Sequence, residues 1–161
     1  MLSNHIQLGT EVVFSEQFKL SFGDIELISK LVEGKFPDYQ RVIPKGHKNT
    51  LVVGREALQA ALQRAAILTT EKFKGVRFSL SSSKITIQST NAEQEEAQEE
   101  IETKYDGEPV EIGFNVTYLL DVLANIKNNE IQISLGDANS SAIITLPGSE
   151  SFKYVVMPMR I

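Results

Sequence analysis

The sequence has 161 residues, of which 42% are hydrophobic and 23% are charged, which is enough for one domain, or one domain plus part of another, with a buried core. It contains no cysteine, which excludes disulfides, thiolate metal sites and cysteine nucleophiles and is typical of a reducing cytoplasm, where we expect the protein to reside. The net charge of −5 argues against a protein that binds DNA mainly by neutralising phosphates. We find neither a signal peptide nor an apolar run long enough to cross a membrane, so no membrane partner is expected.

The first 32 residues carry strand patterns without a helical period. Phe18, Leu20 and Phe22 alternate with polar residues, Gly23-Asp24 offers a tight turn, and the alternation resumes at residue 25. This pattern predicts a β-hairpin, and residues 7–14 are predicted to form a neighbouring strand. Because no helix accompanies these strands, we expect them to close a unit that begins upstream.

Residues 34–49 are rich in glycine, proline and lysine and are typical of a connector, in which Val42 and Ile43 are predicted to form a short extended piece. We therefore place a domain boundary near residue 45.

From Thr50 the chain repeats one pattern of elements. In the first copy we predict a strand at 50–53, a helix from Gly54 to about Leu68, and strands at 76–80, 85–87 and 101–105. In the second we predict a strand at 110–114, a helix at 116–127 capped by Asn115, and strands at 131–135, 142–146 and 152–157. The order β-α-β-β-β thus occurs twice, with about sixty residues between equivalent points. The fold class is therefore α+β, with two helices side by side on antiparallel sheets.

Two surface features accompany this repeat. Residues 93–102 include six glutamates, and this acidic run is interpreted as a solvated face, with an electrostatic contact for a basic partner as the alternative. Ile67 and Leu68 come after two alanines at the end of the first helix. Because four consecutive apolar positions cannot all face one core, one or two of them are expected to be exposed.

The last eight residues, 154–161, are unusually apolar for a chain end. Tyr154 to Val156 are typical of the end of a strand, and Pro158 prevents further pairing. The residues alone leave two interpretations of the segment from Met157 to Ile161: a tail folded back on its own domain, which they favour, or an adaptable binding surface.

Residue patterns for catalysis or metal binding are absent from the sequence. His5 and His47 lack metal-ligand spacing, the glycines form no phosphate loop, and the serines lie in no nucleophile elbow. The acidic run lacks the spacing of a calcium loop. A hydrolase or nuclease would have only dispersed carboxylates for support, so we expect a non-catalytic binding module without cofactor or metal.

Three stretches, residues 36–44, 112–123 and 154–160, resemble the bacterial sliding clamp family, the beta subunit of DNA polymerase III. The shorter stretches 65–68, 71–73, 75–77 and 93–97 are similar too. The resemblance implies the DNA-clamp fold and a non-catalytic processivity factor of replication. Family members have three similar domains and close as homodimers into a ring around double-stranded DNA. Residues 1–45 then correspond to the closing strands of the second domain plus the connector, and residues 46–161 to a complete third domain.

The resemblance also implies a subunit interface and a surface that faces DNA. Ile67 and Leu68 would be the apolar centre of the contact with a second clamp subunit, and Glu93, Glu95, Glu96 and Glu99 would meet basic residues of that subunit. Gln98 stands where a further acid is usual in the family. Candidate residues facing the DNA, through weak contacts, are Arg55, Arg64 and Lys127.

The resemblance finally implies a pocket for short extended peptides that carry a glutamine and then leucine or phenylalanine. Such peptides belong to DNA polymerase subunits, the clamp loader and repair proteins. The matching positions are Pro37, Arg41, Val42, Asn115, Tyr118, Asn139, Ser141, Val155, Val156, Met157, Pro158, Met159, Arg160 and Ile161. Asn139 and Ile161 differ from the usual residues, and a loop that forms one pocket wall in the family has no counterpart here. The alternative is a standalone peptide-binding repeat domain that forms no ring and does not act on DNA.

Overall fold

The computed structural model describes residues 13–14, 17–31, 38–44, 46–47, 49–70 and 73–161. The chain divides into two compact units, Met1–Pro37 and Asp38–Ile161, and each is described by itself.

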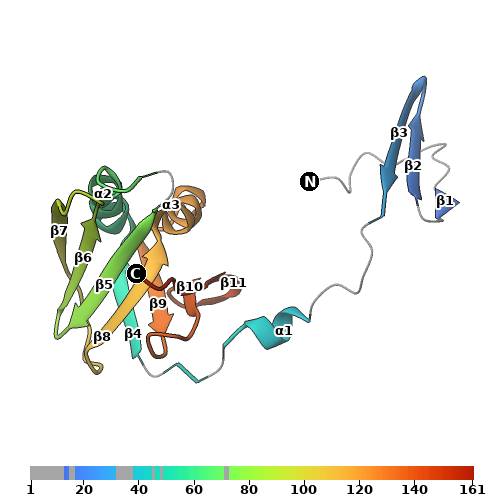
Figure 1. The fold of residues 1–161 in the computed structure, drawn as a ribbon. Coiled ribbons are helices and arrows are strands. Elements are labelled where there is room, and N and C mark those ends of the chain that lie inside the picture. Colours follow the sequence, from blue (N-terminus) through green and yellow to red (C-terminus); the bar gives the residue numbers. More distant parts are fainter. Residues whose placement is uncertain (1–12, 15–16, 32–37, 45, 48, 71–72) are drawn as a thin grey trace. The chain divides into compact units, whose positions relative to one another are not determined.

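The first unit contains a three-stranded antiparallel sheet in the order β1-β2-β3, formed by Val13–Phe14, Gln17–Phe22 and Ile25–Lys30 (Figure 1). The predicted hairpin is confirmed, because Phe22 pairs with Ile25 across a turn in which Gly23 has a φ of 57°. Of the predicted strand 7–14, only β1 lies within the described residues. Ile25 and Ile28, on opposite faces of β3, are both exposed.

The second unit begins with a four-residue helix, α1 (Tyr39–Val42). The prediction of extended backbone was wrong for Val42 and right for Ile43, whose φ and ψ are −73° and 110°. The helix forms because the Asp38 side chain accepts a hydrogen bond from the Gln40 amide at 3.1 Å. Ile43 leaves the helix because it precedes Pro44, which disfavours helical backbone at the residue before it.

The rest of this unit consists of two four-stranded antiparallel sheets and two helices. The first copy of the repeat comprises β4 (Asn49–Gly54), α2 (Arg55–Ala66), β5 (Gly75–Ser81), β6 (Lys84–Thr90) and β7 (Glu96–Glu102). The second comprises β8 (Val110–Asn115), α3 (Val116–Asn125), β9 (Glu130–Leu135), β10 (Ala142–Leu146) and β11 (Ser149–Val156). The predicted double β-α-β-β-β order and the α+β fold class are confirmed.

The two copies interlock through their first strands. The sheets have the orders β11-β10-β9-β4 and β7-β6-β5-β8, so β4 completes the sheet of the second copy and β8 completes that of the first. The register pairs Leu51 with Ile133 in one sheet and Val76 with Phe114 in the other. Neither copy therefore forms its four-stranded sheet alone.

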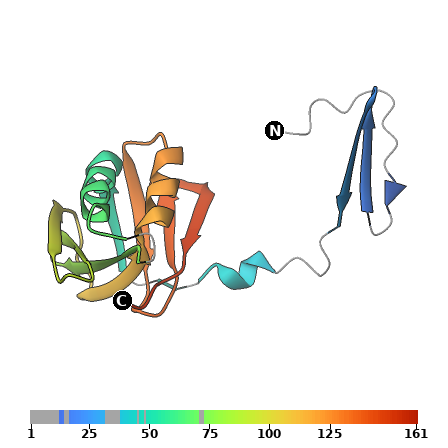
Figure 2. The ribbon, with the colours of Figure 1, turned by 45° about the horizontal axis from the view of Figure 1, so that its top comes forward.

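The core lies between the sheets and the helices, which stand side by side in both views (Figures 1 and 2). Leu58, Leu62 and Ala65 of α2 and Leu119 and Leu123 of α3 are buried, as the apolar stripes predict. Phe78 and Phe114 pack edge to face across the strand pair β5–β8, with ring centres 5.4 Å apart. Among the described residues, no helix has the length and apolar character needed to cross a membrane.

Three predicted element boundaries were wrong. The last strand of the first copy covers Glu96–Glu102 rather than 101–105, and Thr103 instead donates from Oγ1 to the Val52 carbonyl at 2.7 Å. Helix α3 ends at Asn125 rather than Lys127, since Ile126 is extended and buried in the core. Strand β11 ends at Val156, before Met157, because proline at 158 cannot continue the ladder.

Candidate functional site

The C-terminal tail, residues 157–161, leaves strand β11 and returns to strand β8. The Met159 amide donates to the Gly113 carbonyl at 2.8 Å, and the Ile161 side chain lies against Gly75 and Gly113. The tail is therefore folded back on its own domain, as favoured from the residues alone. Met157 is nevertheless 61% exposed, so the same tail also presents an apolar side chain to solvent.

A cleft of about 250 Å³ lies between helix α3 and the end of strand β11. It is lined by Tyr118, Tyr154, Val155, Val156 and Met157. Tyr118 is 53% exposed, so its ring is accessible on the helix side. Such a cleft offers apolar surface to a side chain inserted from outside.

Polar groups fix two parts of this site. The Ser141 hydroxyl lies 3.5 Å from the sulfur of Met157 and donates to it. The Asn115 side-chain oxygen accepts the Thr117 amide at 2.9 Å and thereby caps helix α3, which carries Tyr118.

The structure brings together only some of the predicted pocket residues. Tyr118, Val155, Val156 and Met157 share the cleft, and Ser141 contacts it through Met157. Asn139 and Arg160 are exposed, Arg41 and Val42 belong to α1, and Pro37 lies outside the described residues. Tyr154 lines the cleft but was not among the predicted site residues, although its place on the same strand as Val155 and Val156 was a usable signal.

Near Asn139, Asp137 organises the loop between β9 and β10. Its carboxylate accepts hydrogen bonds from the Ser140 hydroxyl at 2.7 Å and from the Asn139 amide at 2.9 Å. These hydrogen bonds hold the pKa of Asp137 below its usual range, and the bond from Ser140 lowers it most. The carboxylate stays charged and keeps the loop in this conformation.

The apolar part of the predicted subunit interface is accessible. Ile67, the C-terminal cap of α2, is 78% exposed, and Leu68 is partly buried. The expectation of one or two exposed residues here is therefore confirmed.

Side chains alternate between the two faces of strand β7, and this alternation separates the acidic residues of the predicted interface. Glu96 lines the outer face of the sheet, whereas Glu99 points toward helix α2 and accepts two hydrogen bonds from Arg64, at 2.8 and 2.6 Å. The Arg64 hydrogen bond holds the pKa of Glu99 below its usual range and raises that of Arg64. The Glu95 carboxylate accepts from the Asn91 side chain at 2.7 Å in the preceding turn. The predicted acidic residues therefore do not share one face.

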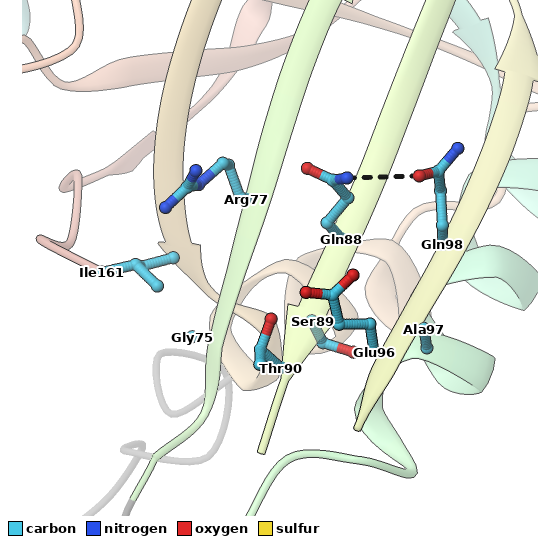
Figure 3. Close-up of a pocket in the computed structure, with 9 residues that line it drawn as sticks. All are labelled: Gly75, Arg77, Gln88, Ser89, Thr90, Glu96, Ala97, Gln98 and Ile161. Atoms are coloured by element: carbon cyan, nitrogen blue, oxygen red, sulfur yellow. Dashed lines mark hydrogen bonds between the residues drawn. The ribbon is translucent and has the colours of Figure 1, made fainter. Parts of the chain in front are cut away.

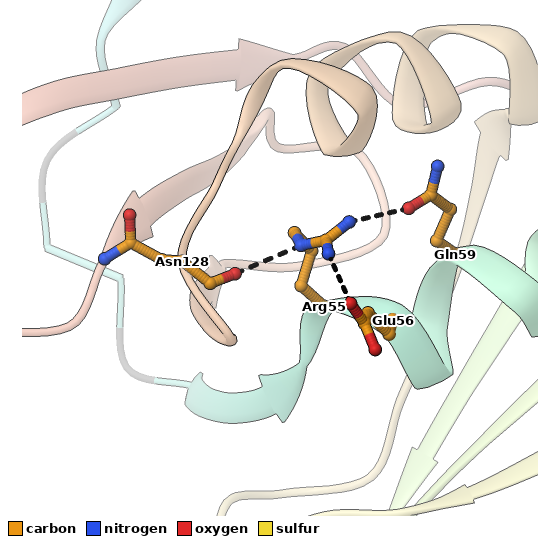
Figure 4. Close-up of polar contacts among 4 residues, drawn as sticks. All are labelled: Arg55, Glu56, Gln59 and Asn128. Carbon is orange, nitrogen blue, oxygen red and sulfur yellow. Dashed lines mark hydrogen bonds and ion pairs between the residues drawn. The ribbon is translucent and has the colours of Figure 1, made fainter.

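Two of the three basic residues predicted to face DNA are paired within the domain. Arg55 donates from Nε to the Asn128 carbonyl at 3.1 Å and from its terminal nitrogens to Gln59 and Glu56, both at 2.8 Å (Figure 4). Arg64 is held by Glu99, and Lys127 is exposed. Among the described residues, no group of three or more histidine, aspartate and glutamate side chains could hold a metal ion.

Comparisons of the whole chain with known proteins agree on one family of relatives. Residues 40–160 match the family described as DNA polymerase III beta subunit, C-terminal domain. The beta sliding clamp of Pseudomonas putida KT2440 is 47% identical over 150 residues, which are 93% of this chain and 41% of that protein. That of Escherichia coli K12 is 46% identical over 147 residues, or 91% and 40% of the two chains.

Solved structures agree with the sequence relatives. The Pseudomonas aeruginosa sliding clamp superposes with a TM-score of 0.81 at 45% identity, covering 92% of this chain and 41% of that one. A structure of the P. aeruginosa clamp bound to griselimycin has a TM-score of 0.80 at 44% identity, covering 94% and 42%. The chain thus spans about 41% of the length of the relatives it matches.

Proposed function

This chain belongs to the DNA polymerase III beta subunit family, the beta sliding clamps, and we propose that it supplies the C-terminal part of a ring that encircles DNA. In that role it tethers the replicative polymerase for processivity and catalyses no reaction. The family match over residues 40–160 supports this proposal, as does the interlocked α+β fold shared with sliding clamps of known structure.

Within this role, the cleft beside Tyr118 is the proposed docking site for partner peptides. The observation that carries this assignment is that Tyr118 from α3 and the residues Val155–Met157 at the end of β11 line one cleft. An apolar anchor of the peptide would enter the cleft, and Asn115, Ser141 and Arg160 would orient its backbone. The peptides would come from polymerase subunits, the clamp loader and repair proteins.

The remaining assignments rest on the same family relationship. Residues 1–45 would be the closing strands of the second clamp domain with the connector, and residues 46–161 the third domain. The proposed contact with a second subunit comprises the exposed Ile67 together with Leu68, Glu93, Glu95, Glu96 and Glu99. Arg55, Arg64 and Lys127 would face the DNA, which the ring holds by topology, so that an acidic net charge is compatible with this function.

Titration of a labelled peptide tests the docking site. A short fluorescent peptide that carries glutamine followed by leucine and phenylalanine is titrated against the full chain, against Tyr118→Ala and against a variant lacking residues 157–161. Tyr118→Ala and the deletion of residues 157–161 should each raise the Kd of the peptide about tenfold or more, as for central anchors of small interfaces.

The matched control for this titration is Lys153→Ala, which truncates an exposed residue of strand β11 next to the cleft. We expect it to leave the Kd unchanged. Equal affinities for the unsubstituted chain, Tyr118→Ala and the truncated variant would contradict the assignment of the cleft.

A further inference from the structure

Two glycines lie under the C-terminal tail on the outer face of the sheet β7-β6-β5-β8. Gly75 is in β5 and Gly113 is in β8, and their neighbours Val76, Ile112 and Phe114 are buried. Because side chains alternate along a strand, both glycines face away from the core. Ile161 lies beside Gly75 on this outer face (Figure 3).

The C-terminal tail lies so close to these two positions that a Cβ atom at either of them would contact it. A Cβ atom at Gly113 would overlap the Met159 carbonyl oxygen and would lie 2.7 Å from two carbons of Ile161. A Cβ atom at Gly75 would lie 3.2 Å from Ile161. The overlap at Gly113 is closer than any real contact of a Cβ atom, so there the tail itself would have to move.

Two anchors hold the tail, and only a very short segment lies between them. Val156 is buried and pairs with Ala142, and the Met159 amide is hydrogen-bonded to Gly113, on the edge strand of its sheet. Only Met157 and Pro158 lie between these two anchors, and the proline ring fixes its own φ. A displacement of Met159 must therefore be absorbed largely at Met157, which lines the cleft.

We propose that Gly113, assisted by Gly75, is the positioning residue of the peptide site: it seats the tail on the sheet and so sets where Met157 stands relative to Tyr118. This inference rests on the proposed docking of peptides in the cleft. Gly113 would not touch the peptide, but it would control the peptide's affinity through the tail.

The test compares Gly113→Ala with the matched substitution Gly54→Ala. A Cβ atom at Gly54 would meet only the Ala57 Cβ, at 3.8 Å, so the control adds the same methyl group without displacing anything. For each variant, the experiment measures the Kd of the labelled peptide, the hydrogen exchange rate of the Met159 amide and the cooperativity of unfolding. We expect Gly113→Ala to accelerate the exchange and to raise the Kd, each about tenfold, with cooperative unfolding retained. Gly54→Ala should change neither quantity.

Gly75→Val provides a second variant should Gly113→Ala fail to fold. It introduces a branched side chain that suits a strand, and its Cβ atom would lie 3.2 Å from the Ile161 side chain. It should raise the Kd by a smaller factor, with faster exchange of the Met159 amide.

The outcomes separate this inference from the proposed function. If Tyr118→Ala raises the Kd of the peptide but the glycine variants bind it like the unsubstituted chain, the positioning role of Gly113 is overturned and the cleft assignment stands. If the glycine variants accelerate exchange of the Met159 amide while the Kd is unchanged, the positioning role of Gly113 is likewise overturned. Failure of the unsubstituted chain to bind the peptide would overturn both.

Discussion

At the scale of single residues, alternation along strand β7 decides which acidic side chains are free to meet a partner. Glu99 is the member of the run that turns toward helix α2, and Arg64 binds it through two parallel hydrogen bonds. Glu96 lies on the opposite face of the same strand. The acidic run, which the sequence suggests is one surface, thus includes Glu99, which is paired within the domain, and Glu96, whose carboxylate faces outward.

The Glu99–Arg64 pair predicts a pH dependence of stability. Because the folded-state pKa of Glu99 is lowered, its contribution is fully present above the unfolded value, about 4.3 for glutamate, and is lost as the pH falls through the folded value. The unsubstituted chain should therefore lose more stability than Glu99→Gln on acidification through this range. Thermal unfolding followed at a series of pH values measures the difference.

The control for this measurement is Glu102→Gln, at an exposed position of the same strand. Parallel pH profiles for the unsubstituted chain and Glu99→Gln would show that the pair contributes nothing through the charge of Glu99.

At the scale of elements, helix α3 connects the fold to the candidate site. Its first turn is capped by Asn115, and Tyr118 is on its exposed side, while Leu119, Val122 and Leu123 pack inward. Asn115 therefore has a structural role in addition to its proposed contact with the peptide. A loss of binding on its replacement needs to be separated from a loss of the helix cap.

Substitutions at Asn115 separate these two roles. Asn115→Ala should lower the free energy of unfolding by about 1 kcal/mol, because the Thr117 amide loses its acceptor. Asn115→Asp should retain the stability, since a carboxylate also caps and interacts favourably with the helix N-terminus. Urea unfolding followed by circular dichroism measures both, and equal destabilisation by the two variants would argue against the cap.

At the scale of the whole second unit, the exchange of first strands between the repeats determines which apolar residues are buried in the core and which remain exposed. Strands β4 and β8 each complete the sheet of the other copy, which brings the two helices together and buries Leu62 completely. Ile67, just beyond the same helix, remains 78% exposed. This exposure leaves the Ile67 side chain accessible for its proposed role at the subunit interface.

This difference in burial predicts that truncating Leu62 and truncating Ile67 change the unfolding free energy by very different amounts. Leu62→Ala should cost about 2–5 kcal/mol of unfolding free energy because it leaves a cavity in the core. Ile67→Ala should change it by less than about 0.5 kcal/mol, as is usual for an exposed position. Urea unfolding of both variants gives the comparison. A large loss for Ile67→Ala would mean that its side chain packs within the domain.

Local patterns predicted most of the fold because they carry their own physical signal. The apolar stripes of α2 and α3, the cap at Asn115 and the turn at Gly23 each depend on neighbours a few residues away. The errors arose where two local preferences compete or where a distant group decides. Asp38 caps a short helix within the predicted connector and so makes Val42 helical rather than extended. Thr103, predicted to lie in a strand, instead donates a hydrogen bond to the Val52 carbonyl.

The sequence by itself determined the repeat, its order of elements, the apolar faces of the helices and, through long matching motifs, the family. Only the tertiary structure decided that Tyr118 meets Val155 to Met157, that Glu99 turns inward to Arg64, and that Gly113 lies beneath Met159. These contacts join residues about thirty to fifty positions apart, and they depend on strand pairing and face alternation across the whole domain. Periodicity fixes which residues share a face of one element, but packing between elements fixes which faces meet.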